Sequence, residues 1–406
     1  MNKTQAKKYA QNSSLIPAAV LGGPPAFSEV LPITKPTIPP VARLTSQYER
    51  ILKSGMITNA GYVKEFERQV AEYLGVKEAV AVSSCTLGLM LTLKVLKLKG
   101  EVILPSFTFH ATGHAIVWNG MRPVFVDCLA DTYNIDPAQV EKAVTAQTSA
   151  ILGVHIFGNP ADISALEKIA KKYRLKLIFD AAHGFGSQYQ RKNVGGFGDA
   201  EVFSLSPTKL LTSGEGGMVA TNDLDLAKQI RIGRNYGDSG DYDSLFSGFN
   251  SRMSEFHALL GIESLRDLEK NVAQRIRMAQ LYKKLLTALP GISFQKIADG
   301  NRSSFKDFSI LIDQKKFGLS RDQLSQALLA ENIIVKKYFY PPVHEQKAFL
   351  SYQAGHAPQL PVTQMVANNI LSLPLYSHIA ESAVRKVCAA LHCIYDQRGP
   401  IKTRIP

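Results

Sequence analysis

The chain contains 406 residues, of which 45% are hydrophobic, and this composition excludes a disordered polypeptide and leaves room for two or three domains. Four cysteines in this length exclude a disulfide scaffold and favour reduced thiols in a cytoplasmic protein. The formal net charge of +13 favours a phosphate-bearing partner, so nucleic acid, an acidic lipid surface and a phosphorylated small molecule remain open. No apolar run approaches the roughly 20 residues of a membrane span, so no membrane partner is expected.

Residues 1–40 are predicted to form a flexible lead-in or arm. Glycine and proline are frequent from residue 22 to residue 40, in GGPPAF and KPTIPP, and proline disfavours a helix there. Four polar residues separate the basic start from a short apolar piece at residues 15–21, which argues against a signal peptide. Periodic structure begins near Leu44, and residues 62–74 have the spacing of an amphipathic helix.

The next part of the chain alternates short β-branched runs with helical patterns and turns. Several of these runs are apolar throughout, as expected of strands buried on both faces of a parallel sheet. The pattern predicts an α/β fold, with a mainly parallel seven-stranded sheet flanked by helices in a large domain at residues 41–268. The seven runs lie at residues 79–83, 102–104, 124–126, 150–156, 175–179, 200–204 and 218–220.

A helical stretch after Arg252 is long enough to bridge two domains. Beyond it, strands are predicted at residues 309–312 and 333–337, and helices near residues 321–331 and 380–395. The sequence therefore predicts a smaller α+β domain at residues 269–406. Ligands of open parallel sheets bind beyond the carboxyl ends of the strands, so the polar residues at those ends are the candidates for chemistry.

Asp180 ends the apolar run LKLIFD, where its carboxylate would face that edge of the sheet. It could be a turn or helix-capping acid, or it could hold a metal or a protonated ring nitrogen. His183 lies three residues further on and could join it. A metal would need more ligands nearby, and the sequence offers none that are convincing.

Lys209 follows three hydroxyl residues, Ser204, Ser206 and Thr208, and precedes a glycine-rich turn. Hydroxyls and backbone amides in such a turn suit a phosphate. A partly desolvated lysine at a strand end has a lowered pKa and can form a Schiff base, although a surface lysine is the alternative interpretation. The pattern GxxxxGK[ST] is absent, which excludes a P-loop ATPase.

Two further strand-to-helix junctions carry candidate ligand contacts. In SSCTLGL, Ser84, Thr86 and a helix N-terminus form a plausible anion site. In PSFTFHATGHA, Phe107 or Phe109 could stack on a planar ligand. Phosphate donors, an aromatic plate, a carboxylate for a ring nitrogen and an amine nucleophile are together the requirements of pyridoxal phosphate.

The motifs in this order resemble the DegT/DnrJ/StrS family of nucleotide-sugar aminotransferases, which are fold-type-I pyridoxal phosphate enzymes. The resemblance extends from about residue 32 to about residue 387. It is carried by LKSGMITNAGYVKEFE, AVSSCTLGL, LPSFTFHAT, GNPADISAL, FDAAHGFGS, FSLSPTKLLTSGEGGMV, GFNSRMSEFHALLG and YFYPPVHEQ.

The resemblance implies a role for each candidate around the cofactor ring. Lys209 would hold the cofactor covalently and shuttle the proton, and Asp180 would pair with the pyridine nitrogen. Phe109 would stack on the ring face, and His183 would lie near its edge or its phenolic oxygen.

The resemblance also implies a phosphate site that two subunits share. The residues of one subunit would be Ser84, Cys85 through its backbone amide, Thr86 and Ser204. Asn250 or Arg252 would reach the phosphate in the neighbouring subunit, which implies a homodimer with shared active sites.

The chain departs from the family pattern at three places. Cys85 stands where glycine is common, Phe179 where glutamate is frequent, and Leu205 with Ser206 where Phe-His is frequent. These changes affect substrate contacts more than cofactor contacts. The lysine itself is present, which distinguishes the chain from related sugar dehydratases that have histidine there.

The expected activity is transfer of an amino group from glutamate or glutamine to a nucleotide-linked 3- or 4-keto-deoxysugar, with pyridoxamine phosphate formed between the half-reactions. A keto-cyclitol acceptor of the scyllo-inosose type is the alternative, which the LGGPPAF lead-in favours. A non-catalytic regulatory protein with the same fold is a second alternative. Nucleic acid is not expected as a partner, because the basic residues are scattered and no recognition motif is present.

Overall fold

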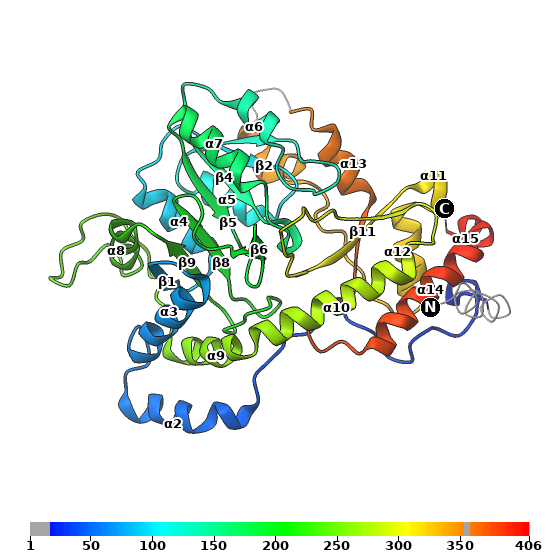
Figure 1. Cartoon of the computed structure of the whole chain (residues 1–406), viewed down its shortest axis with the longest axis horizontal. Coiled ribbons are helices and arrows are strands. Elements are labelled where there is room, and N and C mark those ends of the chain that lie inside the picture. The colour runs from blue at the N-terminus through cyan, green and yellow to red at the C-terminus, as the bar shows by residue number, and fades with distance from the viewer. Residues whose placement is uncertain (1–16, 353–357, 406) are drawn as a thin grey trace.

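In the computed structural model, which describes residues 17–352 and 358–405, a seven-stranded sheet forms the centre of the large domain (Figure 1). Its strand order is β1-β9-β8-β5-β4-β2-β3. Strand β9 is antiparallel to both of its neighbours, whereas the other pairs are parallel. The strands are β1 (Glu78–Val82), β2 (Glu101–Pro105), β3 (Arg122–Val126), β4 (Thr148–Val154), β5 (Lys176–Asp180), β8 (Ala200–Ser204) and β9 (Gly217–Thr221).

Helices cover both faces of this sheet, which explains why its strands are apolar on both sides. On β9, Val219 packs with the core under α4, α5 and α8, while Met218 and Ala220 pack with the core under α3, α7 and α9. The helices of this domain are α2 (Thr45–Ser54), α3 (Gly61–Leu74), α4 (Cys85–Val95), α5 (His110–Val117), α6 (Pro137–Ala143), α7 (Ile163–Tyr173), α8 (Leu224–Gly233) and α9 (Glu255–Arg266).

Helix α10 (Leu268–Leu286) crosses from the large domain to the small one (Figure 1). Val272, near its start, belongs to the core of the large domain, and Met278 belongs to the core of the small domain. The small domain is built on the antiparallel sheet β10-β11-β12. Its elements are β10 (Ile292–Phe294), β11 (Phe308–Ile312), α11 (Gln314–Phe317), α12 (Arg321–Ala330), α13 (Pro361–Asn369), β12 (Ile370–Leu373), α14 (Glu381–Asp396) and α15 (Arg398–Arg404).

The predicted flexible arm is packed against the small domain over the part that the structure describes, residues 17–40. Ala18 and Leu31 are buried in the core of that domain. The carboxylate of Glu331 accepts hydrogen bonds from the backbone amides of Ala19 and Ala26 at 2.8 Å each. Buried apolar side chains and hydrogen-bonded amides thus dock this part of the arm on the small domain, and its flexibility stays a prediction. The rest of the predicted arm, residues 1–16, lies outside the described residues.

The fold class predicted from the sequence is confirmed, and the differences from the prediction are local. The helical stretch after Arg252 is two helices, because α9 ends and α10 begins at Asp267. The strand predicted at residues 333–337 is not regular: Ile333 and Lys336 make isolated bridges, with Leu31 and Ser372. The domain boundary at residues 268/269 falls in the first turn of α10 and stays a prediction.

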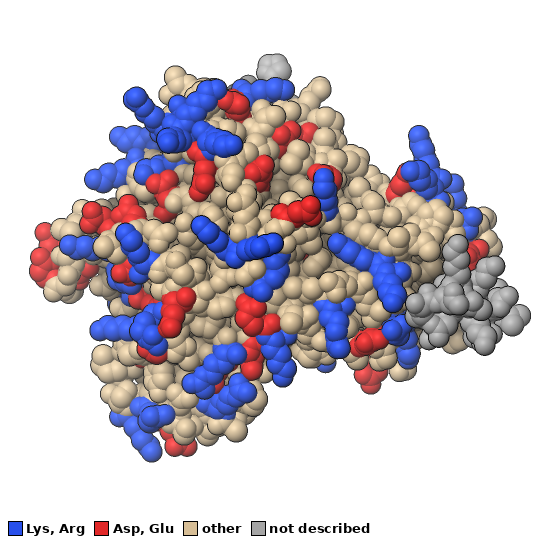
Figure 2. Space-filling view, viewed as in Figure 1, with Lys and Arg blue, Asp and Glu red and all other residues tan. Residues whose placement is uncertain are grey.

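Lys and Arg side chains are spread over the face of the molecule in Figure 2, with Asp and Glu among them. Within residues 17–352 and 358–405, no helix combines the length and the apolar character that a bilayer span needs.

Candidate active site

Polar residues meet at the carboxyl edge of the large sheet, where β5 ends at Asp180 and β8 ends at Ser204. Asp180 is 5% exposed, and its carboxylate accepts hydrogen bonds from Thr112 and Ala182. Thr112 Oγ1 donates to its Oδ2 at 2.7 Å, and the amide of Ala182 donates to its Oδ1 at 3.1 Å. Burial raises the pKa of Asp180, and these hydrogen bonds with the charge of Lys209 oppose the rise.

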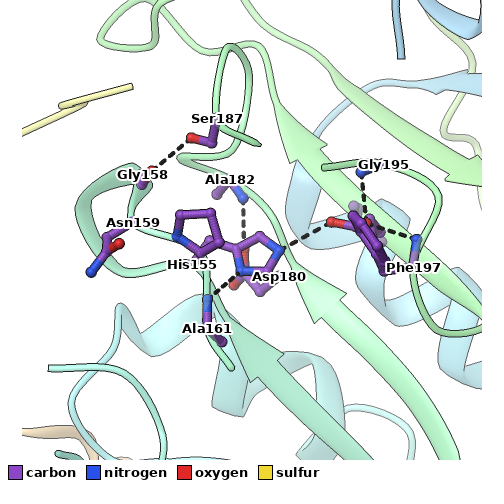
Figure 3. A network of polar contacts seen from close by, with 12 residues as sticks. His155, Gly158, Asn159, Ala161, Asp180, Ala182, Ser187, Gly195 and Phe197 are labelled. Atoms are coloured by element: carbon purple, nitrogen blue, oxygen red, sulfur yellow. Dashed lines mark hydrogen bonds and ion pairs between the residues drawn. The ribbon is translucent and has the colours of Figure 1, made fainter. Parts of the chain in front are cut away.

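A second polar layer, drawn in Figure 3, adjoins Asp180. The ring of His155, fully buried, lies parallel to Phe179 with 4.9 Å between ring centroids, and its Nε2 is 3.0 Å from Glu201 Oε2. The amide of Ala161 donates to His155 Nδ1 at 3.2 Å, which places the proton of a neutral ring on Nε2. His155 is joined to the strand end directly, because its backbone amide donates to the carbonyl of Asp180 at 3.3 Å.

Glu201 is fully buried, and both of its carboxylate oxygens have partners. Oε2 faces His155, and Oε1 accepts the amides of Gly195 at 2.6 Å and Phe197 at 3.0 Å. The carboxylate therefore ties the turn before β8 to the end of β4.

Lys209 lines a small pocket next to this edge. Ser204, His183 and Lys306 line it as well, and the remaining lining residues are Ala182, Phe185 and Leu210. Burial and, to a smaller extent, the charge of Lys306 lower the pKa of Lys209 to about 8, while the charges of Asp307 and Asp180 oppose the shift. A substantial fraction of the amine is therefore neutral near pH 8, as a nucleophile requires.

His183 lies in the same pocket and is fixed by the backbone. The amide of Phe157 donates to its Nδ1 at 3.2 Å, so a neutral ring carries its proton on Nε2. Burial lowers the pKa of His183 well below its ordinary value, and the charges of Lys209 and Lys306 act in the same direction. His183 is therefore an uncharged hydrogen-bond donor at neutral pH.

The turn between β1 and α4 holds the predicted anion site. Ser84 caps α4 by accepting the amide of Leu87 at 3.2 Å, and the helix begins at Cys85. Gly217 pairs with Ser204 in the sheet, and a Cβ at this glycine would lie 2.6 Å from the backbone nitrogen of Cys85. Only glycine permits this close approach, which brings the Ser204 strand end next to the helix N-terminus.

The side chain of Cys85 occupies the space beneath Asp180. Its Sγ lies 3.5 Å from the carbonyl oxygen of Val202 and 4.0 Å from Asp180 Oδ1. Burial raises the pKa of the Cys85 thiol well above its ordinary value, so the group is an uncharged packing element at neutral pH. Thr86, the next residue, is half-buried in the first turn of α4.

The two candidate aromatic plates differ in exposure. Phe107 is fully buried and packs edge-on against Tyr133, Phe157 and Phe339. Phe109 is 50% exposed at the start of α5, with its ring 6.4 Å from that of Phe339. Of the two, Phe109 has the surface that a planar ligand could cover.

Asn250 and Arg252 lie on the segment before α9. Asn250 is exposed, whereas Arg252 donates to Asn235 Oδ1 at 2.8 Å and lies over the ring of Tyr236. The carbonyl of Ser251, between them, accepts the amide of Ser83 at 2.8 Å. The segment thus supports the turn between β1 and α4 of its own chain through its backbone, and the reach into a neighbouring subunit stays a prediction.

Sequence reasoning missed several residues of this region: Thr112, His155, Glu201, Lys306 and Asp307. Three of them, Glu201, Lys306 and Asp307, are charged residues within or next to apolar strands, in AEVFS and in KDFSILI, and this pattern could have identified them. The described residues contain no group of three or more His, Cys, Asp or Glu side chains arranged for a metal ion.

The geometry agrees with comparisons to known proteins. A profile of the DegT/DnrJ/EryC1/StrS aminotransferase family matches residues 41–392. The Escherichia coli protein named dTDP-4-amino-4,6-dideoxy-D-glucose transaminase is 35% identical over 365 residues, which cover 89% of this chain and 98% of that protein.

Two solved structures have the same fold over almost their whole length. DesI, crystallised in the presence of its TDP-sugar product, has a TM-score of 0.90 and 37% identity, with 95% of this chain and 98% of DesI covered. DesV from S. venezuelae, in complex with a ketimine intermediate, has a TM-score of 0.82 and 32% identity, with 87% of this chain and 94% of DesV covered.

The fold is that of the fold-type-I pyridoxal phosphate aminotransferases. Within that class, the chain belongs to the DegT/DnrJ/EryC1/StrS aminotransferase family. The resemblance inferred from the motifs is therefore confirmed, and so is the prediction that the protein is an enzyme.

Proposed function

We propose that this enzyme transfers an amino group from glutamate or glutamine to a nucleotide-linked keto-deoxysugar, using pyridoxal phosphate held by Lys209. The observation that carries the proposal is the meeting of Lys209, Asp180 and the Ser84–Thr86 turn at one edge of the sheet. The relatives support the acceptor class, since the E. coli protein is named a dTDP-sugar transaminase and DesI was solved with a TDP-sugar product.

The residues present fit the cofactor. The free amides at the start of α4 and the hydroxyl of Ser204 suit its phosphate, and the Gly217 approach brings them together. Asp180 suits a protonated ring nitrogen, because a buried carboxylate is stabilised by a hydrogen-bonded cation. Phe109 suits the ring face and His183 the ring edge. The ketimine in the DesV complex supports the same cofactor chemistry here.

Each of these side chains has a distinct task in the proposed reaction. Lys209 would hold the cofactor covalently until the amine of the donor replaces it there, and the released lysine, as a neutral amine, would take the proton from the α-carbon of the donor. Asp180 keeps the ring nitrogen protonated, and His183 donates a hydrogen bond without adding charge. When bound, pyridoxal phosphate supplies an electron sink and carries the amino group between the two substrates.

The test uses ¹⁵N-labelled glutamate or glutamine and a panel of acceptors. The acceptors are nucleotide-linked 3-keto and 4-keto sugars and scyllo-inosose, and mass spectrometry detects the labelled product. We expect amination of a nucleotide sugar. Amination of scyllo-inosose alone would move the enzyme to the keto-cyclitol class, and labelled product from no acceptor would refute the proposal.

A homodimer with shared sites is part of the proposal. Apolar side chains around α2 are exposed in the single chain, namely Val41, Leu52, Met56 and Ile57. Such a patch suits a second subunit, which would bring its Asn250 or Arg252 to the phosphate. Sedimentation equilibrium should give twice the mass of the 44.6 kDa chain. Location in the cytoplasm stays a prediction from the sparse cysteines.

A further inference from the structure

Lys306 reaches the candidate active site from the small domain. The segment that carries it docks on the loop after β4: the amide of Lys306 donates to the carbonyl of Phe157 at 3.0 Å, and the amide of Ser304 donates to that of Gly158 at 3.2 Å. Ser304 Oγ also donates to the carbonyl of His183 at 3.0 Å. These hydrogen bonds fix the position of Lys306 relative to the pocket.

The side chain of Lys306 is 6% exposed and lines the same pocket as Lys209 and His183. Its Nζ pairs with Asp307 Oδ1 at 2.9 Å. The charge of Lys306 lowers the pKa values of both Lys209 and His183, which places the three groups within electrostatic reach of one another.

The charges around Lys306 are not balanced. Arg275 is 1% exposed and donates to the carbonyl oxygens of Phe305 and Lys306 and to the hydroxyl of Ser377. The charge of Asp307 acts on the pKa of Arg275, opposing the lowering by burial, so this carboxylate lies within electrostatic reach of two buried cations. Its other oxygen, Oδ2, is buried and has no hydrogen-bond partner among the described residues. Buried excess charge is costly unless a counter-ion completes the group, so this cluster is suited to receive an anion.

We propose that Lys306 binds the α-carboxylate of the amino-acid donor, and that Asp307 holds the lysine side chain when no carboxylate is present. This inference rests on the proposed function. In an amino acid the α-carboxylate is bonded to the carbon that carries the amino group, about 2.5 Å from the nitrogen. A cation beside Lys209 therefore matches the donor carboxylate. The diphosphate of a nucleotide sugar is separated from the reacting carbon by the sugar ring, so it lies too far away for this lysine.

The Lys306–Asp307 pair also explains how one site could bind both the amino-acid donor and the keto sugar. The donor brings a carboxylate next to the reacting carbon, whereas a keto sugar brings neutral hydroxyls. A lysine that exchanges between a substrate carboxylate and Asp307 leaves no orphaned cation in either half of the reaction.

The first test measures the two half-reactions of Lys306→Met. We expect the KM for glutamate to rise by about 30-fold or more, as for loss of one partner of a buried charge pair, with the KM for the keto sugar changed less than about threefold. Lys283→Met is the matched control, because Lys283 lies over the ring of Phe305 and does not line the pocket. Lys306→Arg should recover part of the glutamate affinity. Equal effects on both substrates, or none on glutamate, would overturn the inference.

The second test removes the carboxylate from the substrate. In the wild type, 4-aminobutyrate, which lacks the α-carboxylate, should be a far poorer donor than glutamate. In Lys306→Met the difference between the two donors should shrink by about 30-fold, because the residue and the carboxylate act as a pair. An unchanged difference would count against the pairing.

A third readout does not depend on turnover. Maleate, a dicarboxylate probe, is titrated calorimetrically into the full chain without cofactor. We expect binding in the wild type and in Lys283→Met, and about 30-fold weaker binding in Lys306→Met. Maleate binding that is unchanged in Lys306→Met, or that is absent in the wild type, would overturn the inference. If Lys306→Met fails to fold, Lys306→Met with Asp307→Asn removes the orphaned carboxylate and takes its place. If the wild type binds maleate but shows no transamination, the proposed function is refuted and the carboxylate site is still supported.

Discussion

Two groups of buried charged side chains adjoin the candidate active site, and they differ in how completely they are satisfied. In the His155–Glu201 pair each carboxylate oxygen has a partner, and the second ring nitrogen of His155 accepts an amide. In the Lys306–Asp307–Arg275 cluster, cations exceed carboxylates and Asp307 Oδ2 has no partner among the described residues. The first group holds a fixed edge for Asp180, whereas the second suits a ligand that comes and goes.

The largest expected effect lies at Lys209, whose pocket includes Lys306 and whose charge acts on Asp180. Lys209→Ala removes the nucleophile and the proton carrier, so transamination should fall by at least about 10⁴-fold. Absorbance should show that the variant no longer attaches the cofactor covalently, while circular dichroism stays that of the wild type. Covalent attachment that persists in Lys209→Ala would refute the role of this lysine.

The His155–Glu201 pair, whose polar atoms all have partners, should contribute to stability as one unit. Glu201→Leu leaves the amides of Gly195 and Phe197 and the ring of His155 without an acceptor, so the free energy of unfolding should fall by about 3 kcal/mol. Urea denaturation measures this loss. Glu201→Gln, which keeps an acceptor oxygen, should lose less.

The control for the pair is Glu49→Leu. Glu49 is exposed and lies 4.0 Å from Lys53, so its loss should change the free energy of unfolding by less than about 0.5 kcal/mol. If Glu201→Leu were as stable as Glu49→Leu, the view of His155 and Glu201 as a fixed scaffold would be wrong.

The Lys306–Asp307–Arg275 cluster should instead affect the pH dependence of cofactor capture by Lys209. The pKa of Lys209 is about 8, so the neutral amine, and with it the rate of covalent cofactor capture, should fall about tenfold per pH unit below pH 8 and level off above it. Lys306→Met removes a cation that lowers this pKa, so the midpoint should move up. Asp307→Asn removes an anion that raises it, so the midpoint should move down. Stopped-flow absorbance measures the rates, and midpoints that stay in place would mean that the cluster does not act on Lys209.

The same contrast explains what the sequence could predict. Strands buried on both faces leave an uninterrupted apolar pattern, so the seven-stranded sheet and its polar carboxyl edge were predicted. Asp180 was predicted because it ends such a strand, and Lys209 because it lies in the turn that follows one. His155, Glu201 and Lys306 were missed because their partners lie far away in the chain: His155 and Glu201 are 46 residues apart, and Lys306 meets Lys209 only when the small domain docks.

The smallest expected effect tests a part of the site that belongs to neither charge group. In Gly217→Ala the new methyl group would lie 2.6 Å from the backbone nitrogen of Cys85, so the anion-binding turn must shift. We expect about tenfold weaker cofactor binding, the order of one charge-assisted hydrogen bond, by fluorescence titration. Gly399→Ala is the matched control, since its Cβ would meet nothing within 4 Å, and it should bind as the wild type does. Because the turn acts on the phosphate alone, the pH midpoint of Lys209 in Gly217→Ala should stay near 8; a shifted midpoint would mean that the turn and the Lys306 cluster are not independent.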